Sequence, residues 1–293
     1  MSTDCSPPAA AMTHPLTSAR SFLFVPATRP ERISKALASG ADAVTVDLED
    51  AVAPPDKAAA RQSLVQAFDA LDAAQRSRLL VRINAVATPW YAADVAAVQQ
   101  LAQGGLGGLM LSKAESASAV AQIATAIGPS CALVPLIESV AGFDAVDAVA
   151  RVPQVLRLAF GHLDFQVDAG LECDAQEAEL VPVRLALVLA SRRAGLAAPI
   201  DGVTTDTQDV ARLQADAGRA RRGGFAGKLC IHPAQVAGVN AAFTPTPDEV
   251  AQARRVQAAF DAAGGGVFSL DGRMVDAPVL RLAQRTLAKI SGR

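Results

Sequence analysis

Short apolar runs alternate with longer amphipathic segments along most of the chain. The apolar runs occupy residues 21–26, 42–49, 79–84, 108–113, 132–138, 155–161, 199–204 and 227–233. The segments between them, such as PERISKALASG and KAAARQSLVQAFDAL, are rich in alanine and have helical spacing. Apolar strands that alternate with helices are typical of a parallel sheet covered by helices. Eight such units predict an α/β fold, a (β/α)8 TIM barrel, with a doubly wound sheet as the alternative.

The two ends of the chain depart from this alternation. Residues 1–19 are rich in Pro, Ser, Thr and Ala, which predicts a loose N-terminal tail. We expect the barrel to cover residues 20–245. Residues 246–293 contain two helical patterns separated by the glycine-rich stretch Gly264 to Gly266 and by VFSLDGRMVDAP. They predict a C-terminal helical extension or lid on a glycine hinge, which could cap the mouth of its own barrel or of a neighbouring one.

Composition and charge exclude several classes of protein. The 293 residues carry a formal net charge of -2 and no basic run, so neither nucleic acid nor a membrane surface is an expected partner. No apolar stretch approaches the roughly 20 residues that span a bilayer. The N-terminus lacks the basic and apolar pattern of a secretory signal, and a cytoplasmic protein is expected. Among the four cysteines there is no CxxC pair, and Cys131 and Cys230 lie in apolar runs as predicted core residues.

Polar residues follow six of the eight apolar runs. In a barrel, the carboxyl ends of all strands lie on the face that carries the active site. The residues are Asp47, Glu49 and Asp50 after the second run, Arg82 and Asn84 after the third, Lys113 after the fourth, Glu138 after the fifth, Gly161, His162 and Asp164 after the sixth, and His232 after the eighth. Their concentration at one predicted face favours a single functional site over separate surface positions.

Glu138 and Asp164 are the candidate metal ligands. Two carboxylates without a nearby Cys or a spaced pair of His suit a hard cation such as Mg²⁺, which keeps several positions for water and substrate oxygens. Either residue alone is also compatible with a helix cap or a surface acid after a strand. Their shared face favours the metal.

Arg82 and Gly161 are candidates for binding an anionic substrate. Arg82 follows the apolar LLV, where burial would be costly without an anionic partner. A bidentate clamp on a substrate carboxylate and a pair with Asp47 or Glu49 are compatible interpretations. Gly161 would allow loop amides to approach a ligand closely.

The remaining strand-end residues are open to more than one interpretation. The carboxylates of Asp47 and Glu49 lie close enough in sequence to perturb each other, with Lys57 and Arg61 as expected partners. We favour an orienting role for this catalytic pair over direct chemistry. Lys113 could form a Schiff base, but a substrate contact is favoured. His162 is expected beside the ligand, whether exposed or with a role of its own, whereas His232 is more simply structural.

Seven segments of the chain resemble the citrate lyase beta-subunit-like CoA-ester lyases. They are RSFLFVPATRPERISKALASGADAVTVDLEDAVAPPDKAAAR, VRINAVATPWYAADV, LIESVAGF, AFGHLDFQVDAG, PIDGVTTDTQD, GFAGKLCIHPAQV and LDGRMVDAPV. They follow the family order from about Arg20 to the C-terminus. The resemblance implies a Mg²⁺-dependent barrel, related to the pyruvate-type aldolases, that forms a trimer or hexamer. It implies Glu138 and Asp164 as metal ligands, Arg82 as the substrate-carboxylate arginine, and Asp276 of the lid as a catalytic acid. His162 and Leu163 depart from the small residue that the family usually has before the metal aspartate, which makes them candidate substrate-binding positions.

The resemblance also implies a reaction. Members cleave or form the carbon–carbon bond of 3-hydroxyacyl thioesters such as citryl-, malyl- or citramalyl-CoA, with a 2-oxo acid and an acetyl-CoA-type thioester as the other partners. Alternatives are a small aldolase that does not use CoA, an enzyme that hydrolyses the thioester, a citrate lyase subunit that needs partner proteins, and a barrel that only binds a small ligand. The acyl chain cannot be read from these residue types, because loop shape decides it.

Overall fold

The structure is a computed structural model that describes residues 14–264 and 266–291. The chain divides into two compact units, and the division falls between Val239 and Asn240. No helix in these two ranges is both long enough and apolar enough to cross a membrane.

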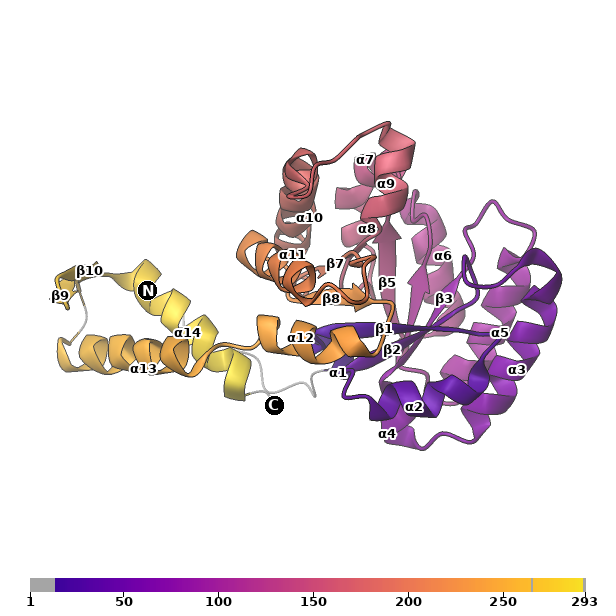
Figure 1. The fold of residues 1–293 in the computed structure, drawn as a ribbon, viewed down its shortest axis with the longest axis horizontal. Helices are drawn as coiled ribbons and strands as arrows, with labels where there is room; N and C mark the ends of the chain where they lie inside the picture. The colour runs from indigo at the N-terminus through magenta and orange to yellow at the C-terminus, as the bar shows by residue number, and fades with distance from the viewer. Residues whose placement is uncertain (1–13, 265, 292–293) are drawn as a thin grey trace, which may run out of the picture. The chain divides into compact units, whose positions relative to one another are not determined.

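The first unit contains a closed barrel of eight parallel strands that neighbour one another in chain order (Figure 1). The strands are β1 (Ser21–Pro26), β2 (Ala43–Asp47), β3 (Leu79–Ile83), β4 (Gly108–Leu111), β5 (Ala132–Ile137), β6 (Ala159–Phe160), β7 (Ile200–Asp201) and β8 (Gly227–Cys230). Phe22, Leu80, Val134 and Leu229 belong to the buried apolar cluster that these strands contribute to. The predicted TIM barrel is therefore confirmed.

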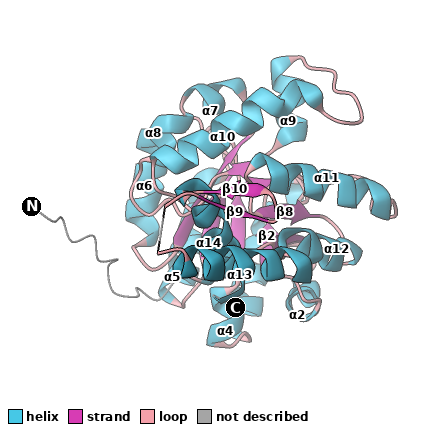
Figure 2. Ribbon diagram, turned by 90° about the vertical axis from the view of Figure 1, so that its left-hand side faces the viewer, coloured by secondary structure: helices cyan, strands magenta, loops and turns pink. Residues whose placement is uncertain are grey.

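Helices surround the strands, as Figure 2 shows for the barrel. They are α2 (Ile33–Ala38), α3 (Lys57–Asp69), α4 (Ala73–Ser77), α5 (Tyr91–Gln103), α6 (Ala117–Ile127), α7 (Val140–Asp144), α8 (Val146–Ala150), α9 (His162–Ala169), α10 (Val181–Arg193), α11 (Val210–Gly223) and α12 (Ala234–Phe243), with 3-10 turns η1 (Pro30–Arg32), η2 (Pro54–Asp56) and η3 (Ala178–Leu180). In α3, Ala60, Leu64 and Phe68 recur every fourth residue and are buried, so one stripe faces the core. Ser116 caps α6, because its side chain accepts a hydrogen bond from the amide of Ala119.

Before β1, a short helix α1 (Pro15–Ser18) corrects the prediction of a loose tail over residues 1–19. Leu16 of α1 is fully buried and belongs to the apolar cluster of the barrel strands. Arg157, also fully buried, donates to the carbonyl oxygens of Leu16 and Ala19 at 3.1 and 2.6 Å. A single leucine in a polar stretch carries too little periodicity to reveal this packing. Residues 1–13 lie outside the described residues.

Two strands are shorter than their apolar runs. In the sixth run only Ala159 and Phe160 form a regular ladder, while Val155 makes an isolated bridge to Leu133. In the seventh run only Ile200 and Asp201 pair. Cys131 and Cys230 are fully buried, which confirms their prediction as core residues.

The second unit is a helical hairpin with a small sheet. Its helices α13 (Pro247–Ala262) and α14 (Ala277–Ser291) flank the antiparallel strands β9 (Phe268–Leu270) and β10 (Arg273–Val275). Asp271 and Gly272, both with positive φ, turn the chain between the strands. The division inside α12 lies before the predicted boundary at residues 245 and 246. A function of this unit as a lid remains a prediction.

Candidate active site

A cavity of about 410 Å³ lies at the carboxyl ends of the barrel strands. It is lined by Phe24, Pro26, Asp47, Asp50, Ala51, Arg82, Leu136, Glu138, Phe160, Gly161, His162, Leu163, Asp164, Gly202, Val203, Leu229 and Ile231. Seven of the residues predicted to be catalytic, substrate-binding or metal-binding are among them, as is Asp50, so residues from the ends of β2, β3, β5 and β6 lie together. The barrel brings them together because parallel strands direct their carboxyl ends to the same face.

Arg82 is the centre of an acidic cluster on one side of the cavity. The register of β2 and β3 places Asp47 directly beside Arg82. Arg82 donates from Nε and Nη2 to the two oxygens of Asp47 at 2.8 and 2.6 Å. Its Nη1 lies 2.8 Å from Glu49 Oε2 and 3.4 Å from the exposed carboxylate of Asp50. Its pairing with three acids holds the guanidinium at the cavity wall, and Asp50 is the partner that a substrate carboxylate could most easily replace.

Lys57 binds the backbone of residues 47–50, the DLED segment. Buried Lys57 donates to the carbonyl oxygens of Leu48 and Glu49 at 2.8 and 2.9 Å. Arg61 pairs with Asp94 at 2.8 Å, which corrects its prediction as a partner of the DLED acids. Burial raises the pKa of Glu49 to about 7, although Arg82 opposes that rise. Glu49 does not line the cavity in the described part of the chain.

Glu138 is 2 % exposed at the end of β5. Its Oε1 accepts the amide of Lys113 at 2.8 Å, while Oε2 accepts no hydrogen bond from the residues described. Burial, followed by the nearby carboxylate of Glu49, raises the pKa of Glu138 to about 8. A methyl group on Gly161 would lie 2.5 Å from Oε2, so glycine is needed to leave room for this carboxylate.

Lys113 contacts Glu138 through the backbone amide of Lys113. Its φ of 46° lies in the left-handed region, which a non-glycine residue adopts at a cost. The Lys113 side chain is exposed and is not among the residues that line the cavity. The Lys113 amide, more than its ammonium group, therefore connects this residue to the site.

Asp164 is the third residue of α9 and lies on the cavity wall with its side chain exposed. Its carboxylate makes no hydrogen bond to a described residue, and its negative charge contributes to the raised pKa of Glu138. Gly161 N donates to Ile137 O at 2.9 Å, so the amide of Gly161 itself is not available to a ligand. The amides of residues 162–164 begin α9 and form the end of a helix that favours anions.

His162 is buried, whereas Leu163 is 42 % exposed at the cavity mouth. The His162 ring lies directly against Gly202, where a methyl group would approach Nδ1 to 2.0 Å. Burial lowers the pKa of His162 to about 4, so its imidazole is neutral near pH 7. His162 thus borders the cavity as a packed side chain.

Asp276 and His232 are two predicted residues that do not line the cavity. Asp276 belongs to the second unit, where its Oδ1 accepts the amide of Val279 at 3.1 Å and caps α14. His232 accepts the amide of Ala234 through Nδ1 at 3.2 Å and lies in the turn before α12. Neither residue is among those that line the cavity.

The other side of the cavity is aliphatic, and of the three aliphatic residues there only Leu163 was predicted at the site. Leu163, Val203 and Ile231 follow β6, β7 and β8, and Leu163 and Ile231 are more than two fifths exposed. Val203 and Ile231 lie inside the predicted apolar runs 199–204 and 227–233, where an apolar residue does not stand out as a candidate for a site. The cavity therefore has a charged half and an aliphatic half.

Glu138 and Asp164 fit a metal ion that takes its remaining ligands from water and substrate. No group of three or more His, Cys, Asp or Glu in the described ranges is arranged to hold a metal. Glu138 and Asp164 repel each other, and Glu138 has one oxygen without a hydrogen bond. Mg²⁺ commonly binds through one or two carboxylates and completes its shell with water and substrate. A divalent cation would relieve the repulsion between the two acids.

Comparisons with known proteins show the family of the chain. A model of the HpcH/HpaI aldolase/citrate lyase family matches residues 20–233. A citrate lyase subunit beta-like protein of Deinococcus radiodurans is 36% identical, over 94% of this chain and 99% of its own length. An L-malyl-CoA/beta-methylmalyl-CoA lyase of Cereibacter sphaeroides is 35% identical, over 90% of this chain and 92% of its own length. The structure of CitE from Mycobacterium tuberculosis with magnesium, acetoacetate and coenzyme A has a TM-score of 0.80 at 35% identity and covers 94% of this chain and 99% of its own.

Fold, site and relatives together define an enzyme of the carbon–carbon lyase class on a TIM barrel. The chain belongs to the HpcH/HpaI aldolase/citrate lyase family. The predicted family and class of enzyme are therefore confirmed.

Proposed function

We propose that the chain is a Mg²⁺-dependent lyase of 3-hydroxyacyl-CoA-type thioesters. Cleavage would give a 2-oxo acid and an acetyl-CoA-type thioester, and condensation would run in reverse. The observation that carries the proposal is the pair of carboxylates Glu138 and Asp164 on one wall of a cavity whose arginine, Arg82, lies in the same charged half. Relatives that act on malyl-CoA thioesters, and one that binds magnesium and coenzyme A, support it.

Glu138 and Asp164 are the proposed ligands of Mg²⁺. When bound there, the ion would supply a Lewis acid for the oxygen of the carbonyl or hydroxyl group at the reacting carbon. The Lys113 amide orients Glu138 by binding Oε1 and leaves Oε2 for coordination. Gly161 provides the space in which this carboxylate stands.

Arg82 is the proposed clamp for the carboxylate of the 2-oxo acid. Asp47 engages its Nε and Nη2, which leaves Nη1 as the donor that faces Glu49 and Asp50. A substrate carboxylate would replace Asp50, the most exposed of the three acids, at 68% side-chain exposure. Asp47 and Glu49 would then keep the guanidinium in place. The amides at the start of α9 offer a second group of donors to the same anion.

Asp276 is the proposed proton carrier, supplied by the second unit of this chain or of a neighbouring copy. In cleavage, a base removes the hydroxyl proton, the carbon–carbon bond breaks, and the enolate of the acyl thioester leaves and takes up a proton. In condensation, a base removes a proton from the α-carbon of the acyl thioester, the resulting enolate attacks the carbonyl carbon of the 2-oxo acid, and the protonated carrier gives its proton to the new hydroxyl oxygen. The aliphatic half of the cavity, around Val203 and Ile231, would receive the acyl part of the thioester.

The test is product analysis with the purified chain. Malyl-, citramalyl- and citryl-CoA are incubated with Mg²⁺, and the 2-oxo acid, the acyl-CoA and free CoA are measured separately. We expect equal amounts of a 2-oxo acid and an acyl-CoA from at least one thioester. Free CoA without acyl-CoA would instead identify a thioester hydrolase. No reaction with any thioester, with turnover of a small aldol, would identify an aldolase that does not use CoA.

A further inference from the structure

Beside the cavity, buried Glu177 is the centre of a second cluster of charged groups. It lies in the loop between α9 and α10 and is 8% exposed. Its φ and ψ of 54° and 44° are left-handed, a conformation that costs on the order of 1 kcal/mol or more for a residue other than glycine. Strain of this kind persists where surrounding contacts hold the residue in place, and it often marks a functional region.

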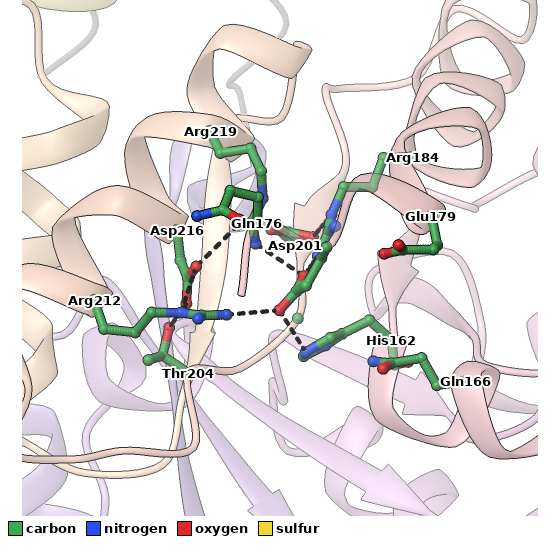
Figure 3. Close-up of polar contacts among 12 residues, drawn as sticks. His162, Gln166, Gln176, Glu179, Arg184, Asp201, Thr204, Arg212, Asp216 and Arg219 are labelled. Atoms are coloured by element: carbon green, nitrogen blue, oxygen red, sulfur yellow. Dashed lines mark hydrogen bonds and ion pairs between the residues drawn. The ribbon is translucent and has the colours of Figure 1, made fainter. Parts of the chain in front are cut away.

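Three arginines hold the Glu177 carboxylate. Arg184 of α10 donates to Oε2 at 2.6 Å, and Arg219 of α11 donates to the same oxygen at 2.9 Å. Arg212 of α11 donates to Oε1 at 3.2 Å. Figure 3 shows the three arginines pointing toward a common centre from two helices, with His162 on another side of that centre.

Two further acids extend the cluster to the strand next to the cavity. Asp201 at the end of β7 accepts a hydrogen bond from Arg184 at 2.9 Å. Asp216 of α11 pairs with Arg212 and Arg219 and accepts the hydroxyl of Thr204 at 2.8 Å. The cluster thereby connects α10, α11 and the β7–α11 loop. A protein with well-packed apolar residues in place of such a buried charged cluster would be about as stable. Stability alone therefore does not account for the cluster.

The cluster reaches the cavity through His162. His162 Nε2 lies 3.7 Å from Glu177 Oε1. The His162 ring packs against Gly202, and the carbonyl oxygen of Gly202 accepts a hydrogen bond from Lys228 Nζ at 2.6 Å. His162 is the first residue of α9, and its carbonyl oxygen accepts Gln166 Nε2 at 3.1 Å. Asp164 stands two residues later in the same turn and has no hydrogen bond of its own to a described residue. The position of its carboxylate therefore depends on where α9 begins.

We propose that Glu177 is a positioning residue that fixes the first turn of α9 through His162, and thereby the Asp164 carboxylate for a divalent cation. The inference rests on the proposed function, since it assumes that Asp164 is a metal ligand. Glu177 is not among the residues that line the cavity. Its effect is expected in metal affinity, in the way that residues behind a metal ligand commonly act.

The test is titration of the full-length chain with Mn²⁺ alone. Binding is measured by calorimetry or by electron paramagnetic resonance. Glu177→Gln keeps the shape of the side chain and removes its charge. We expect it to weaken Mn²⁺ binding about tenfold. The Mg²⁺ concentration for half-maximal activity should rise in parallel, while kcat at saturating Mg²⁺ stays near that of the original chain.

Two further variants make the result decisive. Arg212→Gln removes a partner that is 31% exposed in its side chain, and it should shift Mn²⁺ affinity in the same direction by a smaller factor. Asp147→Asn is the matched control, because Asp147 pairs with Arg193 of α10 at 2.7 Å on the exposed surface, away from the cluster. It should leave Mn²⁺ affinity unchanged.

The outcomes separate the two proposals. Absence of Mn²⁺ binding to the unsubstituted chain would contradict the proposed function itself. Binding in the unsubstituted chain and equal binding in a folded Glu177→Gln would show that the cluster serves stability alone and would overturn the inference. If Glu177→Gln does not fold, Arg212→Gln decides in the same way, since equal affinity there also overturns it.

Discussion

The replacement Gly161→Ala tests the cavity most sharply, because it adds one methyl group beside Glu138. The added carbon would lie 2.5 Å from Glu138 Oε2 and 2.6 Å from its Cβ. Ordinary contacts between such atoms are about 3.5 Å, so Glu138 has to move by roughly 1 Å. Gly161 has a φ of −91°, which alanine adopts readily, so the effect is steric alone. A misplacement of about 1 Å at a catalytic site can cost about a hundredfold in rate.

We therefore expect Gly161→Ala to lower kcat/KM about a hundredfold and to weaken activation by Mg²⁺. The assay is initial-rate cleavage of the preferred thioester over a range of Mg²⁺ concentrations, with a melting curve beside it. Gly223→Ala is the matched control, because a methyl group there has open space and Gly223 ends α11. It should keep full activity. Activity of Gly161→Ala equal to that of the control, with unchanged Mg²⁺ dependence, would refute the steric reasoning.

Three further predictions concern other parts of the chain. Lys113→Gly removes an exposed side chain but keeps the amide that binds Glu138. We expect kcat/KM to stay within about threefold and the free energy of unfolding within about 1 kcal/mol. A large loss of activity would show that the ammonium group contacts the substrate. Leu16→Ala should lower the free energy of unfolding by about 3 kcal/mol in urea denaturation, since the side chain is fully buried in the barrel core; a change below about 0.5 kcal/mol would contradict that packing. Light scattering should give the mass of a trimer or hexamer, as the resemblance implies, and a monomer would contradict it.

Most of the barrel could be predicted because its strands are mainly apolar, although Arg82, Asp201 and Lys228 lie within β3, β7 and β8. Residues 21–26 of the first run are the whole of β1, and the second run extends beyond β2 only by Asp42 at one end and by Leu48 and Glu49 at the other. The sixth run extends further, because residues 155–158 lie before β6. Parallel strands with helices on the outside require this continuous apolar pattern. The same reasoning places Asp47 and Arg82 at neighbouring strand ends, where the register pairs them.

Other features depend on contacts that sequence patterns do not carry. Leu16 fills the barrel core as a single leucine in a polar segment, and nothing local marks it. The pairing of Arg61 with Asp94, and of Glu177 with three arginines, depends on which helices become neighbours. His162 attracts attention beside the acids, yet it packs against Gly202 and is buried. These contacts join residues far apart in sequence, and helix packing decides them.

We propose above that Glu138 and Asp164 hold the cation on which catalysis depends. The most direct test of this proposal compares Mg²⁺-dependent cleavage by Glu138→Gln and Asp164→Asn with that by Glu172→Gln, which changes an exposed acid outside the cavity. We expect each of the first two to lose more than the roughly 10- to 100-fold typical of a residue behind a metal ligand, and the control to lose nothing. Full Mg²⁺-dependent activity in both folded variants would contradict the account.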